Sequence, residues 1–108
     1  SLETAQEKNE LQIGNTRINL SRYEVCVDGE KVVFSPKEVE ILHLMAAHLN
    51  QVFTREQLLD SIWGFDFDGD SRVVDTSIKR IRKKLPEYSM LAVRSVYGVG
   101  YKIEAANA

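Results

Sequence analysis

A stretch of the chain at positions 71–85, SRVVDTSIKRIRKKL, combines two residue patterns that one helix satisfies together. Aliphatic residues recur at i, i+4, i+7 and i+11, and at about 100° per residue they share one narrow arc of a helix. These residues are Val74, Ile78, Ile81 and Leu85. The opposite arc carries Arg72, Thr76, Lys79 and Lys83, with Arg80 beside them. The stretch therefore predicts a helix that packs on one side and presents positive charge on the other.

Charge is distributed unevenly along the chain, although its net value is only −2. Residues 1–70 hold 6 Lys and Arg against 13 Asp and Glu, whereas residues 71–102 hold 8 against 2. This asymmetry predicts one basic face on an otherwise acidic molecule, and DNA binding depends on that local field and not on the total charge. A helix of this width fits the major groove. The alternative is a solvated surface helix whose lysines only provide solubility.

The length of 108 residues predicts one domain with a sizeable core. We expect residues 1–10 to be a linker, residues 11–104 the folded domain, and residues 105–108 a tail. The polar, acidic start lacks a signal-peptide pattern, and no apolar run approaches the roughly 18 residues that span a bilayer. The lone Cys26 cannot form an intramolecular disulfide. Together these features predict a cytoplasmic protein without a membrane segment.

The N-terminal third of the domain, residues 11–34, alternates apolar and polar positions as short strands do. Gly14-Asn15 and Asp28-Gly29 interrupt the alternation, and Asp-Gly is a strong signal for a two-residue hairpin. We therefore predict a small antiparallel sheet of about four strands. Cys26 falls within this alternation and is expected to fill space in the sheet.

Two helix starts follow, and each carries a capping box, in which the first and fourth residues cap each other's backbone N–H groups. The first box is Ser35–Glu38, with proline at the first helical position, and it predicts a helix over residues 35–49. The second is Thr54–Gln57, whose helix is expected to end near Gly64. A short joint over residues 50–53 connects the two helices.

Beyond the basic helix, residues 93–96 and 101–103 read as two strands joined through Tyr97-Gly98-Val99-Gly100. We expect both glycines to supply positive φ in the turn. The order is then sheet, helix, helix, basic helix and hairpin. This order predicts an α+β fold: a winged helix-turn-helix with an N-terminal four-stranded antiparallel sheet, three helices and a C-terminal β-hairpin wing.

Metal binding and catalysis find little support in the residue patterns. Asp66, Asp68 and Asp70 are spaced like the first ligands of an EF-hand, but Gly69 and Ser77 occupy the wrong loop positions for calcium. Asp70 or Ser71 is instead expected to cap the basic helix. His43 and His48 are five residues apart and do not share a helix face. With no catalytic set of Ser, His, Cys or Asp residues either, the sequence predicts no enzyme activity, metal or cofactor.

Three segments carry a resemblance to a known family: LLDSIWG at 58–64, RVVDTSIKRIRKKL at 72–85 and VYGVGY at 96–101. They resemble the OmpR/PhoB family, the DNA-binding effector domains of two-component response regulators, and the likeness runs from about residue 11 to 103. The resemblance implies sequence-specific DNA binding and transcription regulation at the end of a phosphorelay. It also implies a recognition helix at residues 71–85 in the major groove and a wing at residues 93–103 on the DNA backbone or minor groove.

The resemblance assigns expected roles to individual residues. Thr76 and Arg80 match base-reading positions. Positions that match phosphate or backbone contacts are Arg72, Lys79, Arg82, Lys83, Ser95 and Tyr101. Two positions depart from the family pattern: Ser77 often corresponds to His, and Tyr97 corresponds to an Arg that enters the minor groove, for which Arg94 is a candidate replacement. The segment matching the polymerase-contact loop contains Trp63, Phe65, Asp66, Phe67 and Asp68.

The expected partners follow from the same resemblance. They are double-stranded DNA with direct-repeat sites, RNA polymerase and a second copy bound head to tail on DNA. The resemblance also implies an upstream receiver domain, which is absent from this sequence, so we expect the isolated domain to be mostly monomeric in solution. The alternative function is a winged helix that binds only protein, although the basic recognition face favours DNA.

Overall fold

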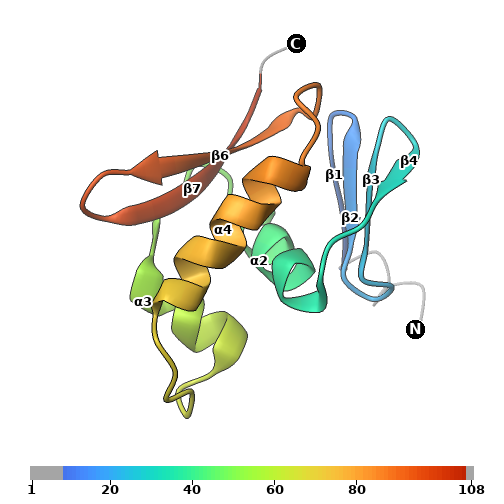
Figure 1. The fold of residues 1–108 in the computed structure, drawn as a ribbon. Coiled ribbons are helices and arrows are strands. Elements are labelled where there is room, and N and C mark those ends of the chain that lie inside the picture. The colour runs from blue at the N-terminus through green and yellow to red at the C-terminus, as the bar shows by residue number, and fades with distance from the viewer. Residues whose placement is uncertain (1–8, 107–108) are drawn as a thin grey trace.

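The computed structural model describes residues 9–106, and Figure 1 shows two small sheets with helices between them. The elements in chain order are β1 (Glu10–Ile13), β2 (Thr16–Asn19), β3 (Glu24–Val27), β4 (Glu30–Val32), α2 (Pro36–Ala46), β5 (Phe53–Thr54), α3 (Arg55–Leu58), η1 (Leu59–Trp63), α4 (Arg72–Lys84), β6 (Leu91–Val96) and β7 (Gly100–Ala105). Most of the expected linker lies outside the described residues, but Glu10 already opens β1, and β7 extends to Ala105. In residues 9–106, no helix has the length and apolarity that crossing a membrane requires.

The N-terminal sheet is the predicted antiparallel meander, in the order β1-β2-β3-β4. Its two tight turns occur at the expected dipeptides: Ile13 pairs with Thr16 across the first, and Val27 pairs with Glu30 across the second. Asp28 and Gly29 both have positive φ, at 52° and 81°, as a type I′ hairpin turn requires. Ile18 and Val25 of this sheet are buried in the same core cluster as the apolar residues of α2.

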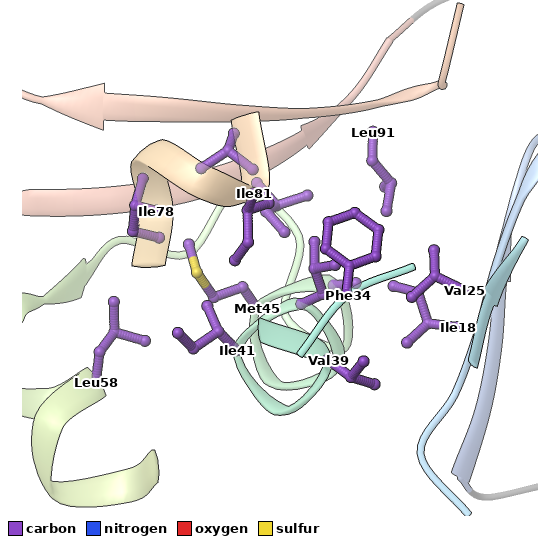
Figure 2. Close-up of a cluster of buried hydrophobic side chains, with 14 of the residues drawn as sticks. Ile18, Val25, Phe34, Val39, Ile41, Met45, Leu58, Ile78, Ile81 and Leu91 are labelled. Carbon is purple, nitrogen blue, oxygen red and sulfur yellow. The ribbon is translucent and has the colours of Figure 1, made fainter. Parts of the chain in front are cut away.

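The hydrophobic core lies around α2, which is packed between the two sheets and behind α4 (Figures 1 and 2). Val39, Ile41, Leu42 and Met45 of α2 are fully buried. The helix ends at Ala46, three residues earlier than predicted. Turns follow over residues 47–50, and the chain leaves them at Asn50, which has a positive φ of 68° and whose N–H donates to the carbonyl of Ile103 in β7 (2.8 Å).

Both predicted capping boxes are present. Ser35 accepts from the backbone N–H of Glu38, and the Glu38 carboxylate accepts from that of Ser35; Thr54 and Gln57 repeat the arrangement. The second helix begins as α3 and continues as one π-helical turn, η1, before it ends at Gly64, whose φ is 96°. The helix-turn-helix is therefore formed by this segment and α4.

The second sheet contains a strand that the sequence pattern did not predict. Its order is β5-β7-β6, and β5 comes from the short joint between the helices: Phe53 pairs with Tyr101, and Thr54 pairs with Gly100. The expectation that both wing glycines supply positive φ is wrong for one of them. Gly98 has a φ of 75°, but Gly100 is needed for space, because a Cβ there would lie 2.0 Å from the carbonyl oxygen of Phe53.

An ion pair between the buried Glu38 and the partly exposed Lys84 also joins α2 to the end of α4. Glu38 is only 2% exposed, and its Oε1 accepts from Lys84 Nζ at 2.6 Å. Burial opposes ionisation of the Glu38 carboxyl, but hydrogen bonds from Lys84 and from the backbone of Ser35 outweigh it and hold its pKa below the usual value. Lys84 thus links the C-terminal end of α4 to the start of α2, although 38% of its side chain remains exposed.

Candidate nucleic-acid interface

Helix α4 has the two sides that its sequence predicts. Val74, Ile78 and Ile81 are at most 1% exposed and hold the helix against the core. The cations on the other side of α4 are exposed to solvent, as are Thr76 and Arg82. Thirteen residues give α4 a length of about 20 Å. The structure therefore presents a helix with a cationic exposed face, and the packing of its buried face on the core fixes its position.

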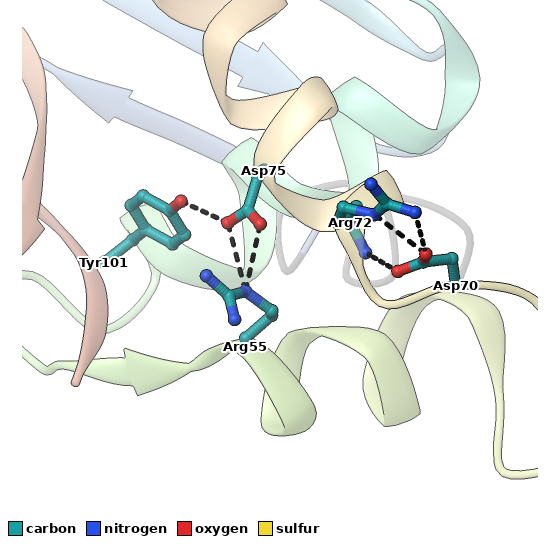
Figure 3. Close-up of polar contacts among 5 residues, drawn as sticks. All are labelled: Arg55, Asp70, Arg72, Asp75 and Tyr101. Atoms are coloured by element: carbon teal, nitrogen blue, oxygen red, sulfur yellow. Dashed lines mark hydrogen bonds and ion pairs between the residues drawn. The ribbon is translucent and has the colours of Figure 1, made fainter. Parts of the chain in front are cut away.

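The start of α4 is organised by Asp70. Its Oδ1 accepts from the backbone N–H of Arg72 (2.9 Å), and its Oδ2 accepts from Arg72 Nε (2.8 Å) and lies 2.6 Å from Nη2 (Figure 3). Hydrogen bonds from Arg72, first from its side chain and then from its backbone, lower the pKa of Asp70. Of the two predicted caps, Asp70 makes the bond, whereas the Ser71 side chain makes none.

A second polar cluster connects α3, α4 and the wing (Figure 3). Arg55 Nε lies 3.1 Å and 3.0 Å from the two carboxylate oxygens of Asp75, and the Tyr101 hydroxyl donates to the same carboxylate. Burial, together with the hydrogen bond to Asp75 and the charge of Asp75, raises the pKa of Tyr101. Asp75, the one acid in the basic helix, therefore ties three elements together. The sequence analysis did not assign this role to Asp75 or Arg55.

Arg82 fixes the wing to α4. Its Nη2 donates to Ser95 Oγ at 2.6 Å, its Nε donates to the carbonyl of Val93 at 3.2 Å, and its guanidinium lies 5.6 Å from the centre of the Tyr101 ring. The resemblance assigned DNA-backbone contacts to Arg82, Ser95 and Tyr101. In the structure these three residues are in contact with one another, so they form the junction between α4 and the β6–β7 hairpin.

The wing has two faces and an exposed tip. Ser95 and Tyr101 pair across β6 and β7 on the face that meets α4, whereas the neighbouring Arg94 projects from the opposite face and lies 3.4 Å from Glu104. The Tyr97 side chain at the tip is fully exposed. Arg94 is therefore on the reverse of the wing, where it cannot replace a cation at position 97 without leaving Glu104.

A shallow hollow runs along the N-terminal half of α4 and is lined by Asp70, Arg72, Val73, Thr76, Ser77 and Arg80. It brings both predicted base-reading residues, Thr76 and Arg80, to one surface with Ser77 on its flank. Lys79, Arg80 and Lys83 form no ion pair within residues 9–106. These three charges are therefore available to a partner.

The predicted polymerase-contact loop separates into a packed part and an exposed part. The rings of Trp63 and Phe67 are 6.3 Å apart, and Phe67 also covers Gly69. Phe65 is 87% exposed, and Asp66 and Asp68 are also at the surface. No group of three or more His, Cys, Asp or Glu residues capable of holding a metal ion occurs in the described part of the chain.

Comparison with known proteins places this surface in context. The family model described as "Transcriptional regulatory protein, C terminal" matches residues 29–103. Among curated proteins, the heme response regulator HssR of Staphylococcus aureus is 41% identical over 97 residues, which cover 89% of this chain and 43% of that protein. The chain thus spans less than half the length of the curated relatives it matches.

Solved structures of DNA-binding domains and of a response regulator are also similar to this chain. The DNA-binding domain of RstA from Klebsiella pneumoniae, in complex with the RstA box, is 30% identical with a TM-score of 0.75, covering 88% of this chain and 96% of that one. The DNA-binding domain of CpxR from E. coli is 28% identical with a TM-score of 0.78, covering 91% and 98%. The response regulator DrrB, a Thermotoga maritima OmpR/PhoB homologue, is 30% identical with a TM-score of 0.78, covering 96% and 52%.

Proposed function

The chain belongs to the OmpR/PhoB family of DNA-binding output domains of response regulators, and we propose that it binds duplex DNA with α4 in the major groove. The observation that supports this placement most directly is the row of exposed cations Lys79, Arg80 and Lys83, which form no ion pair with any other residue of the segment 9–106. Their helix is anchored by buried aliphatic residues, so the row stands at a fixed angle to the surface. A polyanion of helical shape is the partner that such a row fits.

The contacts divide into those that read bases and those that hold phosphates. Thr76 and Arg80 lie one helical turn apart on the exposed face of α4, and we assign them to base edges. Lys79, Lys83 and Arg72 surround them and are assigned to phosphates. At the junction of α4 and the wing, Arg82, Ser95 and Tyr101 set the angle between the two elements and meet the backbone from that position.

The remaining predicted contacts lie at the margins of this surface. Ser77 flanks the hollow on α4 and has a shorter reach than a histidine. Tyr97 extends from the wing tip, where its uncharged ring lacks the attraction of an Arg for the negative potential of the minor groove. Because Arg94 faces away and is paired with Glu104, we expect little minor-groove reading by this wing.

The direct test is selection of bound fragments from a pool of random duplex DNA, followed by a mobility-shift assay with unlabelled competitor. We expect a defined motif, and binding that random competitor displaces only at a large excess. The alternative function, a winged helix that binds only protein, predicts no shifted band at any protein concentration tested, even at low salt.

We further propose that the exposed part of the loop contacts RNA polymerase. Phe65 projects into solvent beside Asp66 and Asp68, whereas Phe67 packs on Trp63. Phe65→Ala should spare DNA binding and abolish activated transcription in a reconstituted assay. Ser61→Ala, at an exposed position before the loop, is the control and should leave both unchanged. Unchanged transcription by Phe65→Ala would remove the polymerase assignment.

The full-length arrangement is also a proposal. Curated relatives are more than twice as long as the matched segment, so we infer a receiver domain upstream of residue 1 and a second copy bound head to tail on direct repeats. DNA and polymerase as partners imply action in the cytoplasm. The domain described by residues 9–106 should sediment as a monomer without DNA, and a tight dimer in its absence would contradict this arrangement.

A further inference from the structure

Asp70 and Arg72 form an ion pair at the edge of the proposed DNA-binding surface. The carboxylate accepts from the Arg72 backbone N–H and from its Nε, and it lies 2.6 Å from Nη2 (Figure 3). Both side chains are in solvent: that of Arg72 is 83% exposed and that of Asp70 is 52% exposed. The pair is therefore not part of the core, and a ligand can reach it.

The edge of the Arg72 guanidinium that binds Asp70 is also one that can bind a phosphate. Its Nε and Nη2 both approach one carboxylate oxygen, Oδ2, and a guanidinium donates from the same pair of N–H groups to phosphate oxygens. Asp70 occupies this fork in the free protein. Lys79, Arg80 and Lys83 on the same helix have no acidic partner among the described residues. Of these four cations, only Arg72 therefore forms an ion pair within the described part of the protein.

Capping does not explain the charge of Asp70. The bond to the backbone N–H of Arg72 requires an oxygen acceptor, and an uncharged Asn or Ser supplies one equally well at a helix start. The negative charge interacts favourably with the positive end of the helix dipole, as an acidic residue near any helix N-terminus does. It also stands at the place where a DNA phosphate would approach Arg72. A carboxylate at this position opposes that approach.

We propose that Asp70 is an intramolecular competitor for DNA phosphate, which holds Arg72 in the free protein and must release it when duplex binds. This role rests on the DNA binding proposed above. Because phosphate contacts carry no sequence information, such a competitor weakens binding to every duplex by the same factor. Asp70 thereby limits non-specific affinity and leaves the base choice of Thr76 and Arg80 unchanged.

The test compares Asp70→Asn with the wild-type protein on a random-sequence duplex of about 20 base pairs, by fluorescence anisotropy across a salt series. Asp70→Asn keeps an oxygen for the Arg72 N–H and removes the charge. We expect binding to tighten about two- to fivefold at low salt, because exposed ion pairs are weak. The slope of log K against log salt should steepen by up to about one.

Asp68→Asn is the matched control, since it removes the same charge from the same loop at a residue that makes no ion pair within residues 9–106. Asp70→Asn should tighten binding more than Asp68→Asn does. In an Arg72→Met background this excess should vanish. An equal effect of the two loop variants, or an excess that persists without Arg72, would overturn the proposal.

Two further measurements keep the outcome unambiguous. Thermal unfolding shows whether the Asp70→Asn variant keeps its fold. If it does not, Asp70→Ser, which retains a good helix cap without charge, replaces it in the binding measurements. A wild-type domain that fails to bind any duplex would refute DNA binding itself. If the wild type binds DNA but neither Asp70→Asn nor Asp70→Ser binds more tightly than Asp68→Asn, only the role of Asp70 is refuted.

Discussion

Two adjacent lysines near the end of α4 should behave differently, because one of them, Lys84, pairs with a buried carboxylate. Lys84 pairs with the buried Glu38, whereas Lys83 forms no ion pair within residues 9–106. Replacing Lys84 with Met leaves a carboxylate that is 2% exposed without its charged partner. Removing one member of a buried pair costs about 3–5 kcal/mol. Because the Lys84 side chain is 38% exposed and Glu38 keeps its bond from the Ser35 backbone, we expect about 2 kcal/mol of lost unfolding free energy.

The pH dependence of this loss has a definite sign. In the wild-type protein the pKa of Glu38 is lowered, so its contribution to stability is present above the unfolded-state pKa and is lost as pH falls through the folded-state value. Without Lys84, burial dominates and the pKa of Glu38 should rise above its unfolded-state value. The variant is then penalised only where Glu38 is ionised, so the difference from wild type should begin to shrink as pH falls through the raised pKa of Glu38 in the variant, and it should be smaller at pH 4, near the unfolded-state value of about 4.3, than at pH 7.

Urea unfolding of the wild type, Lys84→Met and Lys83→Met at pH 7 and at pH 4 measures these free energies. Lys83→Met should stay within about 0.5 kcal/mol of wild type at both values, as exposed substitutions do. The double variant Glu38→Gln with Lys84→Met should recover part of the loss, since no unpaired charge remains. A Lys84→Met variant as stable as Lys83→Met at pH 7, or a loss that grows on acidification, would refute the reasoning.

The remaining predictions concern the recognition surface and the wing. Arg80→Ala should cost about 1–3 kcal/mol of specific binding and relax the preference at one base pair, whereas Lys83→Ala should weaken all duplexes about equally; equal effects of both on specific and random DNA would contradict the assignment of Arg80. Gly100→Ala should destabilise the fold by about 3 kcal/mol, because its Cβ meets the backbone of β5, which cannot move aside. Gly98→Ala, in open space at positive φ, should cost only about 1–2 kcal/mol by thermal unfolding.

Elements with local signals were predictable from the sequence. The Asp28-Gly29 turn, the Ser35 and Thr54 capping boxes, and the aliphatic period of the basic helix each depend on residues within a few positions of one another. Strand β5 carries no such signal, because a two-residue strand exists only through its pairing with β7. The requirement for glycine at position 100 has the same origin, since the neighbour that excludes a Cβ is distant in sequence.

The site shows the same division. The exposed side of α4 followed from helical period and charge, and the structure confirms the burial of Val74, Ile78 and Ile81. Which cations are free could not be predicted, because their partners lie far along the chain: Lys84 is 46 residues from Glu38, and Arg82 is 13 residues from Ser95. A basic run gives the number of charges, and only the fold separates the cations that bind other parts of the domain from those that have no ion-pair partner within residues 9–106.

The central claim is that the outward cations of α4 contact a duplex. The most direct measurement is the slope of log K against log salt for the wild type and for a variant with Lys79, Arg80 and Lys83 all replaced by Gln. With about four phosphate contacts, the wild-type slope should be roughly −4, and because two of the three replaced cations, Lys79 and Lys83, are assigned to phosphates, the replacement should reduce its magnitude by about 2. A flat wild-type dependence, or an unchanged slope in a variant that remains folded, would contradict the account.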